Sequence, residues 1–144
     1  MTLEIATQVA LIAAGVLLLW ALLLGVWKFV EITRSPVGQA HVYVDIAHRA
    51  ALMYSFAAVL LAALVQFSAW PSWVNVTALT VILVFFVGAI ASYCLHGWRK
   101  DTTNQFHPRD TGLIASTVAL IVGEVGGTAV ILAGFVVEQA RTWS

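Results

Sequence analysis

Four long apolar blocks, separated by short polar stretches, constrain this chain more than any other feature. They cover about residues 6–30, 47–68, 74–95 and 111–137. A hydrocarbon core of about 30 Å needs about 20 helical residues, and each block meets that length. A chain of 144 residues that is 61% hydrophobic also has more apolar surface than a small soluble domain can bury. The sequence therefore predicts a single integral membrane domain over residues 1–144, all-α, built as a four-helix up-down bundle.

The ends of these blocks carry further signals. No Lys or Arg precedes the first block, so we interpret it as a permanent span rather than a secretory signal. Ala69, Trp70 and Pro71 end the second block, and the short link predicts an antiparallel hairpin of spans two and three. Asp110 or Thr111 is a suitable N-cap for the fourth span.

The basic residues are distributed unevenly between the two sides of the predicted bundle. Loops one and three and their flanks contain six of the seven, and the other side contains only Arg141. The positive-inside rule then places both loops in the cytoplasm and both termini outside, in a bacterial inner membrane. The six residues are Lys28, Arg34, Arg49, Arg99, Lys100 and Arg109.

All four histidines fall on that same side, and two of them flank a carboxylate. If the second helix starts early, His41, Asp45 and His48 lie at i, i+4 and i+7 on one face. Asp45 can then accept the second ring N–H of His48, as partners of metal-bound histidines do. The alternative is an ordinary helix start in which Asp45 pairs with Arg49 at i, i+4. Two histidines and a carboxylate can also hold zinc or iron if His96 or His107 supplies a third ligand.

Other polar residues in or near the apolar blocks are few. Tyr93 lies near the end of the third span, three residues before His96, and its hydroxyl needs a partner there. Cys94 is the only cysteine, which excludes an internal disulfide and favours a buried apolar role.

Glu124 lies inside the fourth span, beside a small-residue face made by Gly123 and Gly127, with Gly126 expected to widen the groove. A carboxyl group at that depth is costly and indicates either an interface or a functional site.

Three stretches together resemble the styrene oxide isomerase family of small four-span membrane proteins. They are IAHRAALMYSF at residues 46–56, the tyrosine in SYCLHGW at residues 92–98, and TNQFHPRDTG at residues 103–112. The similarity covers most of spans two to four. It is clearest at Ala47 and His48, at Tyr93, and in the loop before the fourth span.

This resemblance implies a specific chemistry. The family binds haem b, forms a homotrimer with haem near the subunit interfaces, and ligates the iron through a histidine that corresponds to His48. Ferric iron acts there as a Lewis acid on a small apolar epoxide, which rearranges to an aldehyde. His41 and Asp45 are further candidates for cofactor binding. The active-site tyrosine of the family corresponds to Tyr93.

The sequence also departs from the family at two polar positions. An asparagine in span two falls at about Tyr54 here, and an aspartate in span three falls at about Phe85. Tyr54 can replace the first as a hydroxyl donor, so we take Tyr54 and Tyr93 as the candidate catalytic residues.

Three functions remain open from the sequence. The first is a haem-dependent epoxide isomerase. The second is a b-type cytochrome, in which His48 shares the iron with His41 or His96. The third is a non-enzymatic membrane subunit whose interface contains Glu124.

Overall fold

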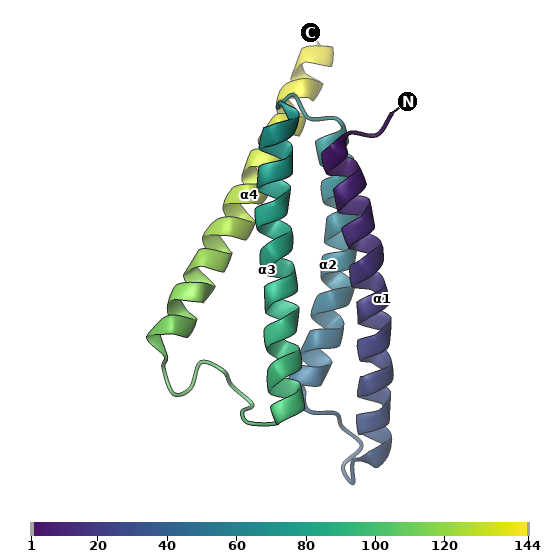
Figure 1. Cartoon of the computed structure of the whole chain (residues 1–144), viewed down its shortest axis with the longest axis vertical. Coiled ribbons are helices and arrows are strands. Elements are labelled where there is room, and N and C mark those ends of the chain that lie inside the picture. Colours follow the sequence, from purple (N-terminus) through teal and green to yellow (C-terminus); the bar gives the residue numbers. More distant parts are fainter. Residues whose placement is uncertain (1, 144) are drawn as a thin grey trace.

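The computed structural model describes residues 2–143 and is entirely helical outside its loops (Figure 1). Its helices are α1 (Ile5–Arg34), α2 (Val42–Gln66), α3 (Ser72–Arg99) and α4 (Thr111–Trp143). They run alternately up and down, so both termini lie at one end with the link 67–71. The opposite end, called the loop end below, contains residues 35–41 and 100–110. The four-helix all-α prediction is confirmed.

Local interactions at the helix ends explain where the helices start and stop. His41 caps α2, because its Nδ1 accepts the backbone N–H of Tyr43, and α2 therefore begins earlier than the apolar block. Pro71 is the N-cap of α3, whereas α2 has already ended at Gln66. Asp110 caps α4 as predicted, since its Oδ1 accepts the backbone N–H of Gly112 at 2.9 Å.

Small residues bring α1 and α2 close together. The buried residues of α1 recur at intervals of three and four, and most of them are alanine. The buried face of α2 has the same period and also consists mostly of small residues. The hydrophobic effect does not drive helix association inside the lipid. Faces made of small residues instead allow the two backbones to approach closely and make van der Waals contacts. The α1 stripe is Ala6, Ala10, Ala14, Leu17, Ala21 and Leu24.

Glycines attach α4 to the rest of the bundle. A Cβ at Gly127 would lie 2.8 Å from Cγ1 of Ile82, and one at Gly123 would collide with the Phe85 ring. These two residues therefore form the close-packing face expected from the sequence. Gly126 does not belong to it, since nothing lies within 4 Å of its Cβ position. The expectation for Gly126 was wrong because this residue is on the exposed side of α4.

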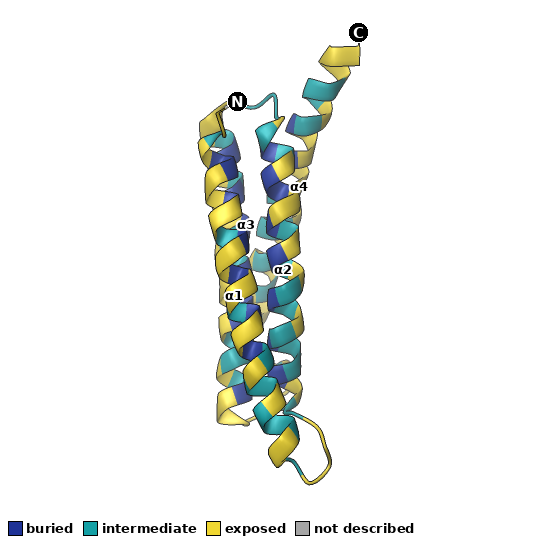
Figure 2. Cartoon of the chain, turned by 90° about the vertical axis from the view of Figure 1, so that its right-hand side faces the viewer, coloured by how far each residue is buried: buried dark blue, intermediate teal, exposed yellow. Residues whose placement is uncertain are grey.

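The outer surface of the bundle is that of a membrane protein. All four helices are long and apolar enough to cross a bilayer, and large apolar side chains cover their outward faces. Buried residues gather between α1, α2 and α3, whereas α4 is mostly exposed (Figure 2). Only 11% of the most apolar window of α4 is buried, against 28–39% for the other three helices. Toward the loop end α4 also leans away from α3 (Figure 1).

Candidate functional site

His48 lies half-buried on α2, against α1. Its Nδ1 is 2.9 Å from the carbonyl oxygen of Ala21. A carbonyl can only accept, so Nδ1 carries the proton and donates, and the lone pair of the neutral ring is on Nε2. Gly25 provides the space for the ring, because a Cβ there would lie 3.0 Å from Cε1 of His48.

This geometry fits an axial ligand of haem iron. Metal-bound histidines almost always donate their second ring N–H to a carboxylate, a carbonyl or a water, which fixes the tautomer. In this chain the acceptor is a backbone carbonyl of the neighbouring helix. The hydrogen bond to Ala21 therefore gives His48 the tautomer that an iron ligand through Nε2 would have, independently of any partner on its own helix.

Asp45 does not orient His48. Its carboxylate forms ion pairs with Lys28 and with Arg49, the second at 2.8 Å. The pairing with Arg49 at i, i+4 is the alternative that the sequence left open. Lys28 adds a link from α1 to α2, so the role of Asp45 is to connect the two helices near the loop end.

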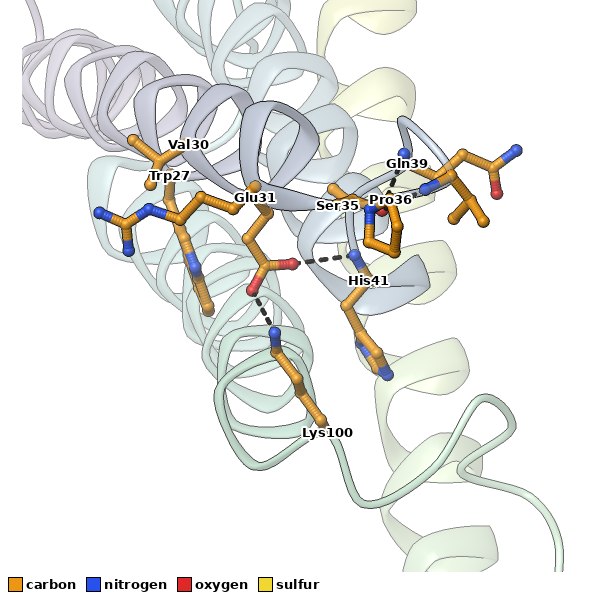
Figure 3. Close-up of a pocket in the computed structure, with 11 residues that line it drawn as sticks. Trp27, Val30, Glu31, Ser35, Pro36, Gln39, His41 and Lys100 are labelled. Carbon is orange, nitrogen blue, oxygen red and sulfur yellow. Dashed lines mark hydrogen bonds and ion pairs between the residues drawn. The ribbon is translucent and has the colours of Figure 1, made fainter.

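His41 belongs to a different part of the molecule. It precedes α2, so it does not share a helical face with Asp45 and His48. Its backbone N–H donates to Glu31 at 2.9 Å, and the other oxygen of Glu31 pairs with Lys100 at 3.0 Å (Figure 3). All three line a cavity at the loop end.

The described part of the chain does not form a zinc or iron site from side chains alone. Among residues 2–143, no three His, Cys, Asp or Glu side chains come close enough together to hold a metal ion. His96 donates to Asp101 at 2.8 Å, and that hydrogen bond holds the pKa of Asp101 below its usual value. His107 is exposed in the loop.

Tyr54 and Tyr93 line a common cavity of about 340 Å³ between α2, α3, α4 and the loop after α3. Tyr54 stacks on Phe86, with ring centroids 3.9 Å apart. The two candidate catalytic hydroxyls are thus brought to one mostly apolar space. The remaining lining residues are Phe85, Gly88, Ala89, Ser92, Gln105, Phe106, Leu113, Ser116, Thr117 and Leu120.

Tyr43 was missed in the sequence, although it is part of the same region. It is buried, its ring stacks on Tyr93 with centroids 6.1 Å apart, and its hydroxyl accepts the backbone N–H of Gln105 at 2.6 Å. It therefore supports Tyr93 and also holds the loop that closes the cavity. One signal for this role was present in the sequence, which is that Tyr43 lies between the two polar residues His41 and Asp45.

Glu124 faces the bundle near these tyrosines. The inward residues of α4 recur at alternating steps of four and three, and Glu124 follows Thr117 and Leu120 in that series. Its Oε1 is buried and has no hydrogen-bond partner among residues 2–143. The acid expected from the sequence thus lies one helical turn beyond Leu120, the last residue of α4 that lines the tyrosine cavity.

His48 and the tyrosine cavity lie on different sides of α2. Six residues separate His48 from Tyr54, which places them about 120° apart around a helix of 3.6 residues per turn. His48 contacts α1, whereas Tyr54 contacts α3. One chain alone does not bring the predicted iron ligand and the predicted catalytic hydroxyls together.

These features define a class of four-helix proteins with membrane-spanning helices, one oriented imidazole and a tyrosine-lined cavity. Comparison of the chain with protein-family models, with curated proteins and with solved structures found no match. The assignment of a function therefore depends on the residues themselves.

Proposed function

We propose that the protein is a haem b-dependent membrane isomerase that converts a small apolar epoxide into an aldehyde. The observation that carries the proposal is the imidazole of His48, whose Nδ1–H is held by the carbonyl of Ala21. This hydrogen bond leaves Nε2 as the free nitrogen, directed by a rigid helix contact. The resemblance of the stretches around His48 and Tyr93 to styrene oxide isomerases supplies the reaction.

The haem would supply a Lewis-acidic ferric iron for the epoxide oxygen. The substrate and the product are isomers, so one C–O bond breaks, one hydride moves to the neighbouring carbon, and no oxidant is consumed. Tyr93 and Tyr54 are the hydroxyl donors that orient the oxygen. The apolar walls of the cavity include Phe85 and Leu120, and Phe86 supports the Tyr54 ring from behind. These walls would accommodate the hydrocarbon part of the substrate and exclude water from a developing cation.

The proposal requires more than one copy of the chain. Because His48 and the tyrosines face different sides of α2, a neighbouring copy must bring the His48 face of one chain to the tyrosine cavity of another. The exposed face of α4 is one surface that such an assembly could use, and a homotrimer with haem near its interfaces would meet this need.

The first experiment is the absorption spectrum of the detergent-purified protein. We expect a haem Soret band in the wild type and its loss in His48→Ala. The matched control is His107→Ala, which removes an exposed loop histidine and leaves the band unchanged. If His48→Ala retains all of its haem, the assignment of the ligand is wrong.

The second experiment tests the reaction. Haem-loaded protein is given styrene oxide and a panel of aryl and alkyl epoxides, and aldehyde formation is followed by gas chromatography. We expect Tyr93→Phe to lower kcat by about 10²-fold, the usual order for one lost donor to a developing oxyanion. A fully loaded protein that converts no epoxide would refute the isomerase while leaving haem binding intact.

The same spectrum distinguishes the two alternatives. A b-type cytochrome needs a second protein ligand and gives a low-spin six-coordinate spectrum that azide does not change. A colourless protein that co-purifies with a larger complex would favour the non-enzymatic subunit.

A further inference from the structure

A second cavity, of about 590 Å³, opens at the loop end and is separate from both His48 and the tyrosine cavity. It is formed by the last turns of α1, the loop 35–41 and the end of α3, as Figure 3 shows. Its lining residues come from three segments that the topology brings together at one end of the bundle. Those used below are Trp27, Val30, Glu31, Arg34, His41 and Lys100.

The charged side chains in the lining of this cavity are two cations, Arg34 and Lys100, and one carboxylate, Glu31. Arg34 has no ion-pair partner among residues 2–143. The Nδ1 of His41 accepts the N–H of Tyr43, so the Nε2–H of its neutral ring is a donor. Glu31 is the one carboxylate in the lining, and both of its oxygens are already engaged, by the His41 N–H and by Lys100. A ligand entering the cavity therefore meets free donors and a net positive charge.

The lining also changes from apolar to polar along α1. Trp27 and Val30 form the part of the wall nearer the middle of the span, and Arg34 lies a turn beyond. With 30 residues, α1 is about 45 Å long, which exceeds the hydrocarbon thickness of about 30 Å, so its last turns reach the headgroup region. A tryptophan at this level is typical of the membrane interface.

We propose that this cavity binds the phosphate-bearing headgroup of an anionic phospholipid. Arg34, Lys100 and the Nε2–H of His41 would receive the phosphate, and Trp27 and Val30 would contact the start of the acyl chains. Basic pockets between membrane helices bind lipid headgroups by the same chemistry. A soluble phosphate would meet the same donors, but it would gain nothing from the apolar wall. This proposal does not depend on haem or on the isomerase activity.

The experiment uses the full-length protein, delipidated in detergent and titrated with phosphatidylglycerol or phosphatidylcholine. Bound lipid is counted by native mass spectrometry. We expect the wild type to retain phosphatidylglycerol several-fold more than phosphatidylcholine. Arg34→Gln and Lys100→Gln should remove most of this preference. Arg109→Gln is the matched control, because it removes one loop-end charge outside the cavity and should leave the preference unchanged.

Glu31→Gln separates binding from simple damage to the fold. A glutamine can still accept the His41 N–H, but it releases the charge of Lys100, so this variant should retain more phosphatidylglycerol than the wild type. Equal retention of both lipids by the wild type would overturn the proposal, as would an equal effect of Arg109→Gln and Arg34→Gln. If inorganic phosphate displaces phosphatidylglycerol at the same concentration, the site takes a soluble phosphate compound and the lipid assignment is wrong.

Discussion

The attachment of α4 can be tested at Gly134. A Cβ at this position would lie 2.7 Å from Nε1 of Trp70 and still closer to Ser68 Oγ and Trp70 Cδ1. Two hydrogen bonds cross the same contact, from Trp70 Nε1 to the Val130 carbonyl at 2.8 Å and from the Ala69 N–H to the Gly134 carbonyl at 3.0 Å. A methyl group in Gly134→Ala must therefore displace the Trp70 ring and weaken both bonds.

The expected magnitude follows from these contacts. Overpacking costs about 1–3 kcal/mol, and each weakened hydrogen bond costs about 1 kcal/mol. Alanine returns about 1 kcal/mol of helix propensity. We therefore expect Gly134→Ala to lower the free energy of unfolding by about 2–4 kcal/mol. Gly126→Ala is the control in the same helix, since nothing lies within 4 Å of its Cβ position, and it should be neutral or slightly stabilising.

The assay is unfolding of the purified protein by sodium dodecyl sulfate in mixed micelles, followed by circular dichroism. Tryptophan fluorescence serves as a second probe that reports on Trp70. If Gly134→Ala and Gly126→Ala unfold at the same detergent fraction, the contact between α4 and the link 67–71 is not the one described, and the position of α4 over the tyrosine cavity loses its support.

Three further changes test the candidate sites. Gly25→Ala should move the His48 ring by a few tenths of an ångström, away from its hydrogen-bond acceptor. The haem affinity of this variant should therefore fall by about 10-fold or more. A variant that binds haem as tightly as the wild type would contradict this prediction. Tyr43→Phe removes the hydrogen-bond acceptor of the Gln105 backbone amide, at a cost of about 1 kcal/mol. Hydrogen exchange of that amide should therefore be about fivefold faster. Unchanged exchange would show that other contacts hold the loop between α3 and α4. Glu124→Leu removes a buried carboxyl oxygen that has no hydrogen-bond partner among residues 2–143. The substitution should raise the free energy of unfolding in detergent by about 1–3 kcal/mol. A loss of stability would mean that a neighbouring copy of the chain supplies a hydrogen-bond partner.

The helices could be predicted from the sequence because the bilayer sets their length and excludes most other backbone structures. The boundaries were less accurate where a polar side chain, rather than hydropathy, decides them. The start of α2 is an example, since the apolar block begins near Ala47 but the Nδ1 of His41 allows the helix to begin at Val42. The start of α4 was correct because an Asp before a helix is a recognised cap.

The candidate site was predictable only in part. Spacing along one helix offered two partners for Asp45, His48 and Arg49, and the structure forms the pair with Arg49. Spacing contains no information about the neighbouring helix, and α1 supplies the other partners, the Ala21 carbonyl for His48 and Lys28 for Asp45. The role of Tyr43 was hidden for the same reason, because its contacts are to Tyr93 and Gln105, which lie about 50 and 62 residues further along the chain.

The packing of α1 against α2 decides where His48 lies. The small residues of α1 and α2 draw the two helices together, and Gly25 leaves just enough space between them for one imidazole. This packing fixes the ring, but it also uses the α1 side of α2, so the tyrosines must lie elsewhere around the helix. The inward face of α4 then supplies Glu124 and the far wall of their cavity, while its outward face stays exposed. Under the proposed function, a single copy would orient the haem ligand or enclose the substrate, and contact between copies would be needed to do both at one site. Loss of haem-dependent activity on dilution to monomers, with His48 unchanged, is the behaviour that this arrangement requires.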